Sequence, residues 1–113
     1  MPRAAATADV FNAIAEARRR DILVFLADNE HSVSDIVARF EMSQPSASKH
    51  LRVLYDVGLV DARREGQQVF YRTNADALRP IAEWARTFER HWRRQLMRIK
   101  ERAEGAPDKR RTP

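Results

Sequence analysis

The chain has 113 residues and no cysteine, and its 21 Lys and Arg residues exceed its 16 Asp and Glu residues, giving a net charge of +5. This length suits one domain with one core. The absence of cysteine excludes disulfides, thiolate metal sites and cysteine nucleophiles. The positive charge favours a polyanionic partner. No apolar run is long enough to span a membrane, and the N-terminus lacks the apolar core of a secretory signal, so we expect a cytoplasmic protein without a membrane partner.

The first part of the chain predicts a frayed end at residues 1–6, followed by two short helices. The first helix begins near Thr7 and carries apolar residues on one side. The second follows a basic junction at residues 17–20, and the polar cluster of residues 28–31 ends it. The three arginines of this junction, Arg18–Arg20, suit phosphate contact and simple solvation equally well.

Two further helices follow in close succession. Ser32 opens the third helix, and Asp35 stands three residues later, which indicates a reciprocal capping box. Ser43 is the predicted N-cap of the fourth helix, with Pro45 in its first turn and Gly58 at its end. Two short helices joined by about three residues, the second polar at its start, are typical of a helix-turn-helix.

The start of the fourth helix carries short hydrogen-bonding groups and cations, which suit base edges and phosphates in a major groove. We expect bases to be read by Gln44, Ser46, Ala47 and Ser48. We expect Lys49, His50 and Arg52 to contact phosphates or base edges. Ala47 also belongs to the apolar stripe with Leu51 and Leu54, and His50 could instead be a packed, neutral side chain against the hairpin. The alternative for the whole helix is an ordinary amphipathic helix with a solvated polar face.

Beyond Gly58 the pattern changes to that of a β-hairpin. The run at residues 69–73 is rich in β-branched and aromatic residues, and Gly66 lies in the connection that precedes it. A hairpin directly after a recognition helix is a wing. We expect its basic tip to contact a DNA backbone or minor groove through Arg63, Arg64 and Gln67.

A helical period returns at about Asp76 and continues to about Glu104, which predicts one helix of roughly 40 Å. Its apolar stripe exceeds what a small core needs, so it is expected to pair with a second copy of the chain. The predicted dimer contacts are Phe88, Trp92, Leu96 and Ile99, with Phe11 of the first helix. Trp84 and Trp92 could alternatively line a ligand pocket between subunits. Residues 1–104 are therefore one domain in this interpretation, and residues 105–113 are a disordered basic tail.

The predicted fold class is mostly α with a small β-hairpin, a winged helix-turn-helix with a long C-terminal dimerisation helix. From Asp9 to Arg72 the sequence resembles the arsenical-repressor (ArsR) family of bacterial winged-helix regulators. The segments that carry the resemblance are SQPSASKHLRVL at residues 43–54, the GLV that follows, and REGQQVFYR in the wing. The resemblance implies a homodimer that binds a double-stranded DNA operator and represses, with an inducer that lowers the affinity for DNA.

The chain differs from the metal-sensing members of that family. Ser32 and Ser34 occupy the two positions where those members have cysteines. A neutral hydroxyl cannot replace a thiolate as the ligand of a soft metal. The second family site needs a His pair with carboxylates, and the last helix offers only His91. We therefore expect no metal and no cofactor, and the inducer is not identified by the sequence.

An enzyme is not expected either. The chain has only three glycines and no phosphate-cradling glycine loop, and no serine stands in a recognisable Ser-His-acid arrangement. The sequence thus predicts a homodimeric, sequence-specific transcriptional repressor that does not respond to metals. Two alternatives remain open at this point: a sensor of a small molecule or oxidant on the same fold, and a winged-helix protein-interaction module that never binds DNA.

Overall fold

The computed structural model describes residues 7–105. The frayed end expected at residues 1–6 and all but the first residue of the expected basic tail lie outside the described residues. The chain forms two compact units, and the boundary between them lies between Ile81 and Ala82. The single domain expected over residues 1–104 stays a prediction.

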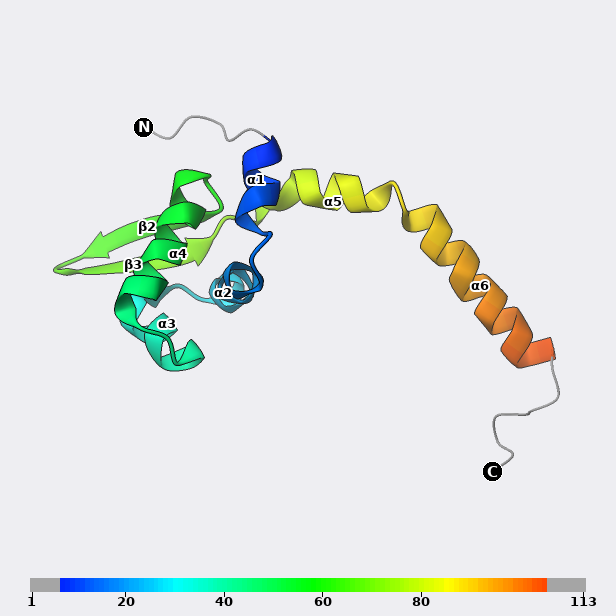
Figure 1. Ribbon diagram of the computed structural model, residues 1–113, viewed down its shortest axis with the longest axis horizontal. Coiled ribbons are helices and arrows are strands. Elements are labelled where there is room, and N and C mark those ends of the chain that lie inside the picture. Colours follow the sequence, from blue (N-terminus) through cyan, green and yellow to red (C-terminus); the bar gives the residue numbers. More distant parts are fainter. Residues whose placement is uncertain (1–6, 106–113) are drawn as a thin grey trace, which may run out of the picture. The chain divides into compact units, whose positions relative to one another are not determined.

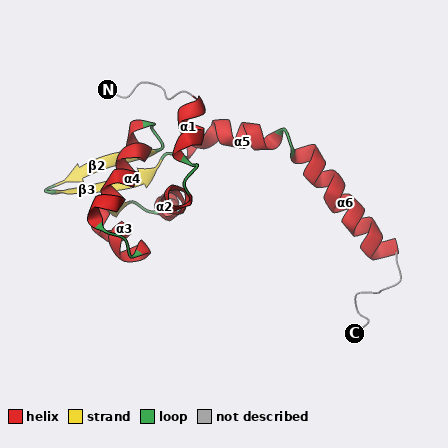
Figure 2. Ribbon diagram, in the orientation of Figure 1, coloured by secondary structure: helices red, strands yellow, loops and turns green. Residues whose placement is uncertain are grey.

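The first unit has the element order of a winged helix-turn-helix (Figures 1 and 2). Its elements are α1 (Thr7–Ala13), α2 (Ala17–Asp28), β1 (His31–Ser32), α3 (Val33–Phe40), α4 (Gln44–Asp56), β2 (Val60–Glu65), β3 (Gln68–Thr73) and the 3-10 helix η1 (Ala75–Leu78). The three strands form one antiparallel sheet in the order β1-β3-β2. This arrangement confirms the predicted fold class.

The apolar residues that recur at helical spacing in α2, α3 and α4 form the core of this unit. The largest fully buried side chains are Ile22, Leu26, Ile36, Leu51, Leu54, Leu59 and Val60. Each contributes roughly 1.5–3 kcal/mol relative to an exposed position. Because these residues come from three helices and the start of β2, the core holds α4 beside the hairpin.

Local hydrogen bonds set the start of α3 and of α4, as the sequence predicts. The Asp35 N–H donates to Ser32 Oγ at 3.2 Å, and the Ser32 N–H donates to Asp35 Oδ2 at 3.1 Å, which completes the capping box. Ser43 Oγ accepts from the Ser46 N–H at 3.2 Å. Glu41 ends α3 in the left-handed region with φ 52°. These caps delimit the turn between the two helices.

The two-residue strand β1 was not predicted. His31 pairs with Tyr71 and Ser32 pairs with Phe70 in an antiparallel ladder. The sequence shows only a polar cluster here, because so short a strand is defined by its partner in β3 rather than by its own pattern. The predicted glycine roles are confirmed: Gly58 follows α4 with φ 81°, and Gly66 turns the hairpin with φ 64°.

The long C-terminal helix is interrupted, so the prediction of one continuous helix is wrong at this point. α5 (Arg79–Arg86) starts in the first unit, and α6 (Glu89–Gly105) lies wholly in the second. The Thr87 hydroxyl and the Thr87 N–H both donate to the Trp84 carbonyl, at 2.7 and 3.1 Å, and the Phe88 N–H donates to the Ala85 carbonyl at 3.0 Å. Such i-to-i−3 bonds tighten the last turn of α5 and end it.

No helix within residues 7–105 combines the length and the apolar character needed to cross a membrane. In the second unit none of the described residues is buried.

Candidate nucleic-acid interface

The polar face of α4 is open to solvent over its first three turns. Every predicted contact residue there except Ala47 and His50 is exposed: Gln44, Ser46, Ser48, Lys49 and Arg52. Ala47 is completely buried, so its predicted base contact is wrong. The physical reason is the helical period, which places Ala47 on the same face as Leu51 and Leu54. Its role is to hold the helix on the core while its polar neighbours face outward.

His50 lies partly buried on the side of α4 that faces the start of α2. Its Nδ1 is buried and has no hydrogen-bond partner among residues 7–105. Burial lowers the pKa of His50, and the charged groups acting on it are Glu16, Arg18, Arg19 and Lys49. This environment favours the packed, neutral form, although the neighbours come from α2 and its N-cap rather than from the hairpin.

The two wing arginines differ in what surrounds them. Arg63 forms ion pairs with Glu30 and Glu65, and its guanidinium lies 5.1 Å from the centre of the Phe70 ring. These bonds raise the pKa of Arg63, and the bond from Arg63 lowers the pKa of Glu30. Arg64 has no ion pair with any described residue. Successive residues of a strand point to opposite faces, so only one of the two arginines is tied to these carboxylates.

The other predicted polar contacts remain available. Gln67 is exposed in the two-residue turn at the tip of the hairpin. Lys49 has no ion pair within the described part of the chain, and Arg52 has only a loose one with Asp56 at 3.9 Å. A loose, exposed pair of this kind contributes little and is readily exchanged for another anion. The unpaired cations of the winged unit that face outward therefore include Lys49 and Arg64.

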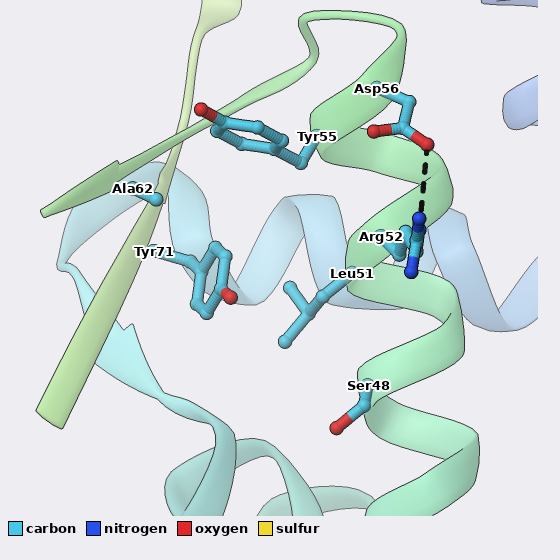
Figure 3. A pocket seen from close by; sticks show the side chains of 7 residues that line it. All are labelled: Ser48, Leu51, Arg52, Tyr55, Asp56, Ala62 and Tyr71. Atoms are coloured by element: carbon cyan, nitrogen blue, oxygen red, sulfur yellow. Dashed lines mark ion pairs between the residues drawn. The ribbon is translucent and has the colours of Figure 1, made fainter.

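A hollow of about 380 Å³ separates α4 from the hairpin. Figure 3 shows Leu51 of α4 and Tyr71 of β3 pointing toward one another across it, with the Arg52–Asp56 pair on the helix. The remaining lining residues are Ser48, Tyr55 and Ala62. Tyr55 is 44% exposed and was not among the predicted contacts. The signal that could have identified it is an aromatic residue with a polar tip on the solvent side of α4.

The three arginines of the predicted junction, Arg18–Arg20, lie in the first turn of α2, and two of them bond to the end of α1. Arg19 donates to the carbonyl of Ala13 at 2.5 Å, and Arg20 donates to that of Ile14 at 2.7 Å. These carbonyls lie at the end of α1, where helical partners are lacking. Arg18 stands over the Phe40 ring and lies 3.8 Å from Asp21. The cluster therefore has a local structural role that the sequence did not predict, and phosphate contact stays an open alternative.

The predicted dimer residues occupy both units. Phe11 of α1 is partly buried. The C-terminal residues are exposed, by 41% for Phe88, 51% for Trp92, 64% for Leu96 and 57% for Ile99. Trp84 packs edge to face on Phe88 with ring centres 5.5 Å apart. Apolar side chains of this size, gathered on α6 and on the residue that precedes it, are typical of an interaction surface.

Ser32 and Ser34, which stand where metal-sensing members of the family have cysteines, lie at the start of α3. Ser32 is a helix cap, as described, and Ser34 is exposed. His31 Nδ1 lies 3.2 Å from Asp35 Oδ2, and the backbone hydrogen bond from Ser32 lowers the pKa of Asp35. Within residues 7–105, no three or more His, Asp and Glu side chains gather closely enough to hold a metal ion.

Comparison with known proteins agrees with this geometry. The family described as "Bacterial regulatory protein, arsR family" matches residues 16–62. The transcriptional activator HlyU of Vibrio cholerae is 40% identical over 74 residues, which cover 66% of this chain and 68% of HlyU. The transcriptional repressor SdpR of Bacillus subtilis is 34% identical over 80 residues, 71% of this chain and 89% of SdpR.

A solved structure is also similar to this chain. It is the homodimeric winged helix-turn-helix DNA-binding domain of Mb0332 from Mycobacterium bovis, with a TM-score of 0.62 and 38% identity, covering 74% of this chain and 79% of that one. The family match over residues 16–62 includes the capped helix pair α3 and α4 of the candidate interface. The chain belongs to the arsR family of bacterial regulatory proteins.

Proposed function

We propose that this protein is a homodimeric, sequence-specific DNA-binding transcriptional repressor of the bacterial cytoplasm. The observation that carries the proposal is the two-sided construction of α4. Ala47, Leu51 and Leu54 are buried, and the residues between them present amide, hydroxyl and ammonium groups to solvent. Such a helix fits a major groove, where these groups bind base edges and phosphates.

The contacts divide into two classes. Gln44, Ser46 and Ser48 read base edges, because their short side chains extend from the first turns of the helix. Lys49 and Arg52 bind phosphate, with Arg64 and Gln67 contributing from the wing. Arg63 contributes less to DNA binding than expected, because its ion pairs with Glu30 and Glu65 must break first.

Dimerisation gives the interface its geometry. Two recognition helices enter successive major grooves about 34 Å apart, which one subunit cannot do. The exposed residues Phe88, Trp92, Leu96 and Ile99, together with Phe11, supply the contacts between subunits. Support comes from the similar Mb0332 domain, which is described as homodimeric. Repression is the proposed direction, as in SdpR, and activation, as in HlyU, is the alternative. No metal response is proposed because Ser32 and Ser34 supply no thiolate.

The test compares two duplexes of equal length, one from upstream of the protein's own gene and one with its sequence scrambled. Gln44→Ala should narrow the difference in affinity between them by about 1–3 kcal/mol, since a base-edge contact is lost. Lys49→Ala should weaken binding to both duplexes alike, because a phosphate contact is independent of sequence. Fluorescence anisotropy at fixed salt measures both.

Arg63→Ala is the matched control for Lys49→Ala, because it removes a cation that is already paired. It should change affinity less than Lys49→Ala does. A wild-type protein that binds both duplexes equally at physiological salt would refute sequence-specific reading by α4.

A further inference from the structure

The positive charge of the chain is not in the winged unit. Residues 1–81 carry eleven basic residues (Lys and Arg) and eleven acidic residues (Asp and Glu). Residues 82–113 carry ten basic and five acidic residues. The entire net charge of +5 therefore belongs to the C-terminal part. Phosphate binding depends on cations, so the part of the chain with surplus charge is a candidate for contacts that the winged unit does not make.

Within α6 these cations are ordered. Arginine recurs at every fourth residue, at Arg90, Arg94, Arg98 and Arg102. Residues four apart are neighbours on a helix surface, about 6 Å apart along the axis, so the four guanidinium groups form a continuous ridge about 18 Å long. We call these four residues the arginine ridge.

None of the four ridge arginines forms an ion pair with a described residue. Residues 90–100 contain no Asp or Glu, and the nearest carboxylate on this side of α6 is that of Glu101, three residues after Arg98. The ion pair within α6 joins Arg93 to Glu89 at 2.8 Å, and Arg93 stands outside the ridge. Like charges four residues apart repel one another and weaken a helix, so the ridge would gain from a bound polyanion. All four of its residues are exposed.

A hollow on the surface of α6 is a candidate binding site for an anion. It measures about 380 Å³ and is lined by Gln95, Arg98, Ile99 and Arg102. Two of these four residues are arginines and none is acidic. A guanidinium offers several N–H donors in a fixed plane, which suits the oxygens of a phosphate.

The ridge and the apolar stripe can be used at the same time. Arg90 and Arg94 are each two residues from Trp92, and two residues turn a helix by about 200°. They therefore lie on the opposite side of α6 from Trp92. If the stripe is covered by a second subunit, as proposed above, α6 has no apolar face left to insert into a lipid surface. Arg90 and Arg94 then remain in solvent, whereas Arg98 and Arg102 lie at the border of the stripe, beside Ile99. This argument favours nucleic acid over a membrane.

We propose that the arginine ridge of α6 binds the phosphate backbone of duplex DNA without reading its sequence. This inference rests on the proposed function, because that function brings DNA to the protein. The ridge adds a second, purely electrostatic contact to the base-reading contact of α4. It adds to the sequence-independent affinity that Lys49, Arg52 and Arg64 supply from the winged unit, whose total charge is balanced.

The test measures the salt dependence of binding to the operator duplex and to its scrambled counterpart. In the full chain, replacing all four ridge arginines by glutamine should reduce the slope of log affinity against log salt by about 3 to 4 per subunit. The loss should be equal on both duplexes. Glutamine and arginine have similar helix propensity, so circular dichroism should show α6 retained. Replacing the same four residues by lysine should keep the wild-type slope, because lysine preserves the charge.

Arg93→Gln is the control, since it removes an α6 cation that is already paired with Glu89, and it should leave the slope nearly unchanged. If the fourfold variant loses its helix or its dimer, Arg94→Gln alone should still reduce the slope by about 0.9. An unchanged slope in both variants would overturn the proposal. So would loss of binding to phosphatidylserine vesicles with binding to DNA intact, which would assign the ridge to lipid.

The two proposals fail in different ways. If α4 does not read sequence, the wild type shows no preference for the operator duplex, and the effect of the ridge on both duplexes can still be measured. If the ridge does not bind DNA, the wild type still prefers the operator duplex, and Gln44→Ala still loses that preference. The slope of log affinity against log salt is then the same in the fourfold glutamine variant as in the wild type.

Discussion

The winged unit and the C-terminal segment of this chain bury their apolar residues to very different extents. From α1 to the start of α5, apolar residues form a shared core, and eleven of them are buried. In residues 82–105 large side chains such as Trp92 and Leu96 are more than half exposed. The first region is therefore stabilised by its own contacts, whereas the second presents surfaces that its own fold leaves uncovered. The difference teaches that the core of the winged unit fixes α4 in place, whereas the C-terminal segment carries surfaces available to other molecules.

Removing an aromatic side chain from the C-terminal stripe should have the largest effect on assembly. Trp92→Ala should shift the protein toward monomer by up to about 3–5 kcal/mol, the usual effect of truncating a packed aromatic residue. Operator binding should weaken although no DNA contact is altered. Sedimentation measures the first effect and anisotropy the second.

The circular dichroism signal of the winged unit should be unchanged in Trp92→Ala. A variant that stays a full dimer with wild-type affinity would place the interface elsewhere. A variant that unfolds would place Trp92 in the core of a subunit, and the contrast between the two regions would fail.

The reverse experiment removes a core residue of the winged unit. Leu54 is fully buried, so Leu54→Ala should lower the free energy of unfolding by about 2–5 kcal/mol. Val24→Ala is the matched control, because Val24 is also aliphatic and lies in the same unit but is 74% exposed. That change should stay within about 0.5 kcal/mol. Urea unfolding followed by circular dichroism compares them, and equal losses would show that Val24 is covered in solution.

What the sequence predicted correctly depends on short-range interactions. The capping box of Ser32 and Asp35, the Ser43 cap and the two turn glycines are each determined by residues three or four positions apart. The apolar period of α4 likewise predicts which side faces the core. Since these features together define a helix pair followed by a hairpin, the fold class could be predicted from them.

What the sequence did not show depends on contacts between distant residues or on competition for one group. Strand β1 exists because His31 meets Tyr71. Arg63 is a wing cation by position, yet Glu30 from before β1 pairs with it. Ala47 fits both a base-reading set and an apolar stripe, and burial decides between them. The break before α6 arises because the Thr87 hydroxyl bonds to the carbonyl three residues back.

The contact residues proposed for DNA and for the dimer remain predictions. The charge balance gives one further lesson. A net charge of +5 suggested a polyanionic partner for the protein, but residues 1–81, which hold the recognition helix and the wing, are balanced. Charge summed over a whole chain does not say which region carries it.

The smallest expected effect tests whether the partly buried His50 belongs to the core side of α4. Burial lowers the pKa of His50 below its ordinary value of about 6.5. As the pH falls through that value, the unfolded chain takes up a proton that the folded chain still resists, so the free energy of unfolding decreases until His50 also titrates in the folded protein. The surrounding groups Glu16, Arg18, Arg19 and Lys49 are present in both states.

His50→Gln should therefore reduce the loss of stability between about pH 7.5 and pH 5.5. His91→Gln is the matched control, because His91 is exposed on α6, and it should leave that loss as it is in the wild type. Urea unfolding at both pH values provides the comparison. If His50→Gln keeps the full wild-type dependence on pH, then the imidazole is solvated when the protein is free, and its place beside α2 would give way to the DNA-facing position that the sequence first suggested.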